Sequence, residues 1–78
     1  MRIPRAISAD RLIRALEQMG YEIVRQKGSH VRMRRDGRVP HMISVPRHNP
    51  LKFGTAHGIL TEVASVLKVT VEEIANLL

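Results

Sequence analysis

The chain of 78 residues contains no cysteine, and only four of its residues are proline and five glycine. The lack of cysteine excludes disulfide bonds, thiolate nucleophiles and zinc sites with cysteine ligands. No apolar run approaches the ~20 residues of a membrane span, and no hydrophobic signal segment follows the basic N-terminus. With 44% apolar and 26% charged residues, the composition is that of a globular domain. We therefore expect a cytoplasmic protein.

The length of the chain sets a second limit. Residues 1–78 suffice for one small domain and no more. We expect a core of this size without disulfides to be only marginally stable. A partner protein or assembly into a homo-oligomer would then help to hold it.

Positive charge is concentrated in the first half of the sequence. The thirteen lysines and arginines exceed the seven acidic residues by six. Residues 1–38 carry ten basic and four acidic side chains, whereas residues 39–78 carry three of each. A basic surface this concentrated is typical of proteins that bind a phosphate backbone, although it is also compatible with a merely solvated face.

Apolar spacing and turn residues divide the chain into six elements. Ser8 is expected to cap a helix that Gly20 ends, Thr55 a second helix, and Thr70 a third through a capping box with Glu73. Asp36-Gly37 predicts a hairpin turn. The expected strands are Tyr21–Gln26, His30–Arg35 and Met42–Val45. The order α-β-β-β-α-α predicts an α+β fold, a three-stranded antiparallel sheet with helices on one face.

The second predicted strand separates two kinds of side chain. Because strand side chains alternate between faces, Val31 and Met33 should pack against the helices. His30, Arg32 and Arg34 should then share the open face. Cleavage of RNA without a metal needs proton transfer and cations that stabilise the phosphate. Histidine, with an ordinary pKa near ~6.5, suits the first task, and arginine the second.

Several segments together resemble the HicA (YcfA-like) mRNA interferase toxins. They are Gly28-Ser29-His30 after Tyr-Glu-Ile-Val-Arg-Gln-Lys, the Asp-Gly hairpin, Val45-Pro46-Arg47-His48, Leu51-Lys52-Phe53-Gly54-Thr55 and Val71-Glu72-Glu73-Ile74-Ala75-Asn76-Leu77-Leu78. Their order and spacing cover the chain from about Ser8 to its end. The family often has an aromatic residue shortly after the histidine, where this chain has Met33.

The resemblance implies a double-stranded-RNA-binding-like fold, a toxin role in a type II toxin-antitoxin system, and cleavage of mRNA, which we expect to need no metal ion. It makes His30 the catalytic residue and Gly28-Ser29 the turn that shapes its surroundings. Arg25, Lys27, Arg32 and Arg34 would position the RNA. The implied protein partner is a HicB-like antitoxin that neutralises the toxin.

The other histidines and aromatic residues have alternative interpretations. His48 is either part of a loop or a second proton-transfer group, and His41 is expected at the surface. Tyr21 is expected to be buried rather than a stacking platform, and Phe53 to anchor the core. The four histidines lack carboxylates at ligand spacing, so we predict no metal and no cofactor.

Two classes of binding protein remain as alternatives to a nuclease. A double-stranded-RNA-binding module without catalysis would read the shape of RNA through phosphate and 2′-hydroxyl contacts. The last twenty residues also resemble a helix-turn-helix. However, Glu72 and Glu73 would repel DNA from its second helix, which disfavours this interpretation.

Overall fold

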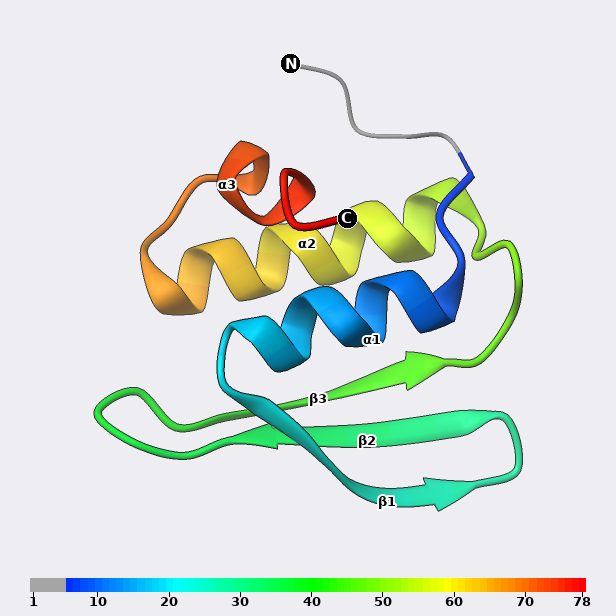
Figure 1. Ribbon diagram of the computed structural model, residues 1–78, viewed down its shortest axis with the longest axis horizontal. Coiled ribbons are helices and arrows are strands. Elements are labelled where there is room, and N and C mark those ends of the chain that lie inside the picture. Colours follow the sequence, from blue (N-terminus) through cyan, green and yellow to red (C-terminus); the bar gives the residue numbers. More distant parts are fainter. Residues whose placement is uncertain (1–5) are drawn as a thin grey trace.

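The computed structural model describes residues 6–78. The elements are α1 (Ala9–Gln18), β1 (Tyr21–Lys27), β2 (His30–Arg35), β3 (His41–Pro46), α2 (Phe53–Leu67) and α3 (Val71–Ala75). The strands form one antiparallel sheet in the order β1-β2-β3. Helices cover one face of this sheet and leave the other open (Figure 1). The predicted α+β fold and element order are confirmed, whereas residues 1–5 of the predicted domain lie outside the described part.

The core lies between the sheet and the two longer helices. The Ser8 hydroxyl accepts a hydrogen bond from the Arg11 backbone N–H at 3.1 Å, which caps α1 as predicted. Apolar residues at helical spacing, Leu12 and Leu16 among them, then face the sheet and are fully buried.

Within residues 6–78, no helix has the length and apolar character needed to cross a membrane.

The start of α2 differs from the prediction. Lys52, and not Thr55, occupies the N-cap, and its side chain makes no capping hydrogen bond. Leu51 is buried and its backbone N–H donates to the Ile7 carbonyl at 2.8 Å, so the chain is fixed directly before the helix. Because Leu51 fills the core there, Phe53 is left 47% exposed and stacks on His57 instead. The predictions for Thr55 and Phe53 were therefore wrong.

The C-terminal helix forms as its sequence predicts. The Thr70 hydroxyl accepts from the Glu73 N–H at 3.1 Å, and the Glu73 carboxylate accepts from the Thr70 N–H at 3.2 Å. This reciprocal capping box supports a helix of only five residues. Ile74 is buried, and α3 packs on α2, away from the open face of the sheet (Figure 1).

A hydrogen-bonded chain ties the sheet to α2. The Tyr21 hydroxyl bonds His41 Nδ1 at 2.6 Å, and His41 Nε2 bonds the Glu62 carboxylate at 2.8 Å. Tyr21 is buried, as predicted, and this burial raises its pKa; Glu62 acts in the same direction and Arg35 against it. His41 was expected at the surface, but its side chain is only 14% exposed because both partners enclose it.

Candidate active site

A two-residue turn places His30 at one end of the open face. β1 ends at Lys27, one residue later than predicted, and Gly28 and Ser29 lead directly into β2. Gly28 has φ of +59°, a left-handed conformation that costs glycine little. The Ser29 carbonyl accepts a hydrogen bond from the Arg47 N–H, which joins the turn to the loop after β3. The turn makes Lys27 and His30 cross-strand partners.

The alternation predicted for β2 is confirmed. Val31 and Met33 are fully buried under the helices. His30, Arg32 and Arg34 are exposed on the opposite side. One strand thus contributes both to the core and to a basic surface, and that surface starts with an imidazole.

A β-bulge in β1 brings two further cations to the same face. The pairing passes from Ile23 opposite Met33 directly to Arg25 opposite Arg32, so Val24 is an additional residue. Under strict alternation Arg25 and Lys27 would share the helix-covered face with Tyr21. The bulge reverses the alternation and aligns them with Arg32 and His30, as bulges beside functional sites often do.

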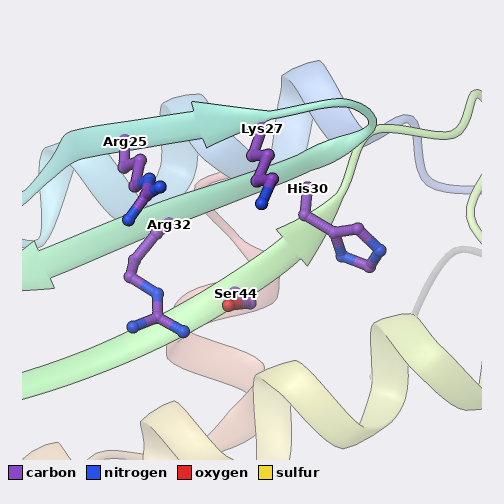
Figure 2. Close-up of a pocket in the computed structure, with 5 residues that line it drawn as sticks. All are labelled: Arg25, Lys27, His30, Arg32 and Ser44. Atoms are coloured by element: carbon purple, nitrogen blue, oxygen red, sulfur yellow. The ribbon is translucent and has the colours of Figure 1, made fainter.

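These side chains line a pocket of about 410 Å³ on the open face. Its lining consists of Arg25 and Lys27 from β1, His30 and Arg32 from β2, and Ser44 from β3. Figure 2 shows the Arg25 and Lys27 side chains extending from β1 across β2, with Arg32 near Ser44 and His30 at one end. A pocket with three cations, one imidazole and one hydroxyl suits a phosphodiester group.

The cations of the pocket are available for an anion. In the described residues 6–78, no acidic side chain lines the pocket, and the ring of His30 has no hydrogen bond or ion pair. Arg32 Nη1 lies 3.6 Å from the Met42 sulfur, a weak contact. Arg34 lies outside the pocket lining and pairs with Asp36 at 3.3 Å.

The remaining predicted residues surround the pocket or lie apart from it. Gly28 and Ser29 form the turn between Lys27 and His30. His48 is exposed in the loop after β3 and is not among the lining residues. Alternation along β3 could have identified Ser44, because it lies between the buried Ile43 and Val45 and pairs with Arg32.

Arg47 holds the loop that follows β3 against the rest of the domain. Its Nε bonds the Asp10 carboxylate at 3.1 Å, and its Nη1 donates to the Gln26 side-chain oxygen at 3.0 Å. α1, β1 and this loop are thereby connected at the end of the sheet where His30 lies. Across residues 6–78, histidine and acidic side chains form no group of three or more suited to hold a metal ion.

Comparison with protein-family models assigns the sequence to a toxin family. Residues 9–64 match the model of the HicA toxin of bacterial toxin-antitoxin. The matched segment begins with α1, ends within α2 and contains all five residues that line the pocket. No match was found to a curated protein or to a solved structure.

Proposed function

The chain belongs to the HicA toxin family of bacterial toxin-antitoxin systems, and from this we propose that it is an endoribonuclease that cleaves mRNA with His30. Membership in the family implies an antitoxin as its protein partner. The observation that carries the proposed activity is the pocket, in which the imidazole of His30 adjoins three cationic side chains. We place the activity in the cytoplasm, where mRNA is translated.

The proposed reaction is attack of a ribose 2′-hydroxyl on the neighbouring phosphate. The 2′-oxygen forms a bond to phosphorus, the bond from phosphorus to the 5′-oxygen breaks, and the products are a 2′,3′-cyclic phosphate and a 5′-hydroxyl. His30 transfers a proton in this step, since an imidazole can accept or donate one near neutral pH. No step of this scheme requires a metal ion.

The remaining lining residues support the phosphate. Arg25 and Arg32 are cross-strand partners, so their guanidiniums can hold phosphate oxygens from two adjacent strands. Such fixed positive charges stabilise the additional negative charge of the transition state. The Ser44 hydroxyl, beside Arg32, can donate a hydrogen bond to a phosphate oxygen or accept one from a 2′-hydroxyl.

A matched pair of histidine variants tests the activity. His30→Ala should lower the cleavage rate of an RNA oligonucleotide by about 10²–10⁴. Its melting temperature and RNA affinity should stay close to those of the parent, because His30 is exposed and its replacement leaves the three cations of the pocket in place. His57→Ala, an exposed histidine on α2, is the control and should cleave normally. All reactions contain EDTA. Cleavage by the parent only after an excess of divalent metal is added would contradict the proposed mechanism.

The alternative is a double-stranded-RNA-binding module without catalysis, which the open basic face would also suit. The same variants separate the two functions. Binding of RNA that survives His30→Ala, together with no cleavage by the parent protein, would select the binding module. Cleavage by the parent that the substitution abolishes would select the nuclease.

A further inference from the structure

We propose that Lys27 is a second catalytic residue, which donates the proton that the departing 5′-oxygen needs. This inference rests on the proposed ribonuclease activity. It assigns the second proton transfer, the one to the departing 5′-oxygen, for which His30 alone does not account. An alkoxide is a poor leaving group unless it is protonated as it departs. The pocket therefore needs a proton donor in addition to the group that accepts the 2′-hydroxyl proton.

Elimination among the lining residues leads to Lys27. The pocket contains one imidazole, two guanidiniums, one hydroxyl and one ammonium. Guanidiniums keep their protons in proteins and serve as fixed charges. A serine hydroxyl is a weak acid that would itself become an alkoxide. The ammonium of Lys27 is the remaining group with a proton that it can transfer.

The geometry of the hairpin places Lys27 beside His30. They are the last residue of β1 and the first of β2, and they pair directly across the Gly28-Ser29 turn. Side chains opposite each other on one face have Cβ atoms ~5 Å apart, a separation that a scissile phosphate can bridge. The bulge at Val24 puts Lys27 on this face. In Figure 2 its side chain extends across β2 within the pocket that His30 bounds.

The proposed step balances protons and charge. The neutral imidazole of His30 takes the proton of the 2′-hydroxyl as the bond between the 2′-oxygen and phosphorus forms. The ammonium of Lys27 gives a proton to the 5′-oxygen as the bond between that oxygen and phosphorus breaks. His30 is then protonated and Lys27 neutral, and exchange with water restores both groups. No co-reactant beyond water is required.

His48 is the alternative source of the proton. It follows Pro46, the β3 partner of His30, by two residues. Its side chain is exposed in the loop and does not line the pocket. The structure therefore favours Lys27, and the experiment includes both residues.

A substrate that needs no acid distinguishes proton donation from simple phosphate binding. The two substrates are an RNA dinucleotide and the same dinucleotide with sulfur in place of the bridging 5′-oxygen, because a thiolate leaves without protonation. Lys27→Arg keeps the positive charge but cannot donate a proton. We expect this variant to cleave the oxygen substrate about 10²–10⁴ more slowly than the parent and the sulfur substrate at nearly the parent rate. The near-parent rate on the sulfur substrate would also show that the variant folds and binds this substrate.

Three results would overturn the inference. Equal losses on both substrates would make Lys27 a phosphate-binding residue, and no loss on either would remove it from the reaction. A selective loss on the oxygen substrate in His48→Ala, with Lys27→Arg unaffected, would assign the proton to His48. In each of these cases the proposed ribonuclease activity would still stand, because the parent would cleave RNA and His30→Ala would not. A parent protein that cleaves neither substrate would instead refute the activity itself.

Discussion

The cations of the pocket should determine how RNA affinity changes with salt. A bound phosphate displaces counterions from the RNA, and each one neutralised contributes about −0.7 to the slope of log affinity against log salt for a single strand. We choose Arg32→Ala because Arg32 lines the pocket from the central strand and has no acidic partner among residues 6–78.

The structure sets the expected size of the effect. Three lining cations, namely Arg25, Lys27 and Arg32, would give a slope of about −2.1 if each neutralises one phosphate. Arg34 is left out because Asp36 partly compensates its charge. RNA affinity should then fall about 20-fold between about 50 and about 200 mM salt. In Arg32→Ala the slope should be about −1.4 and the loss about 7-fold.

The assay is fluorescence anisotropy with a labelled single-stranded RNA, measured in the His30→Ala background so that no RNA is cleaved. The control is Arg14→Ala, which removes the same charge from an exposed position on α1. We expect its slope to equal that of the parent background. Equal slopes for Arg32→Ala and Arg14→Ala would refute the reasoning, because binding would then follow net charge rather than the pocket. A slope near zero in the parent background would refute the reasoning as well.

Three other measurements test the turn, the buried tyrosine and the partner surface. Gly28→Ala should destabilise the fold by about 1 kcal/mol, and Gly28→Asn by less, because φ is +59° at this position. A thermal melt that shows unchanged stability for the alanine variant would contradict this. Burial raises the pKa of Tyr21, so the absorbance of this single tyrosine should titrate above pH 10 in the folded protein. The contribution of Tyr21 to stability should be fully present below that pH and should be lost as the pH rises through the raised pKa. A titration midpoint equal to that in denaturant would contradict this. An antitoxin with an acidic surface should cover His30 and bind more weakly after neutralisation of Arg32 and Arg34, whereas a complex that blocks cleavage but leaves His30 open would be inconsistent with this.

The element order could be predicted because local residues determine it. Ser8 and Thr70 cap their helices in the structure as in the prediction, and Gly20 and Gly37 adopt positive φ where a turn was expected. The faces of β2 could also be predicted, since Val31 is an apolar residue between polar ones in a central strand. These features depend on neighbours in the sequence, which hydrophobic spacing and turn chemistry describe.

The features that could not be predicted depend on contacts between distant segments. The bulge at Val24 arises from the pairing of β1 with β2, and spacing within β1 alone does not reveal it. His41 is enclosed because Tyr21 and Glu62, from two other elements, meet at its ring. Alternation along β3 puts Ser44 on the open face, but its position within the pocket depends on the register, which places it opposite Arg32. The sequence therefore indicated the catalytic candidate His30, and the register supplied its neighbours.

The additional residue in β1 has a consequence for deletions in this strand. Without Val24, Ile23 would still pair with Met33 and the strand would continue with regular alternation, so Arg25 would keep its orientation. A deletion at Gln26, beyond the bulge, would instead turn Lys27 toward the helices if the bulge is kept, because a shift of one residue exchanges the two faces of a strand. The loss of one residue from β1 should therefore be tolerated at the bulge and selected against on its C-terminal side. An evolving strand of this kind can lose one apolar residue and keep its charged surface.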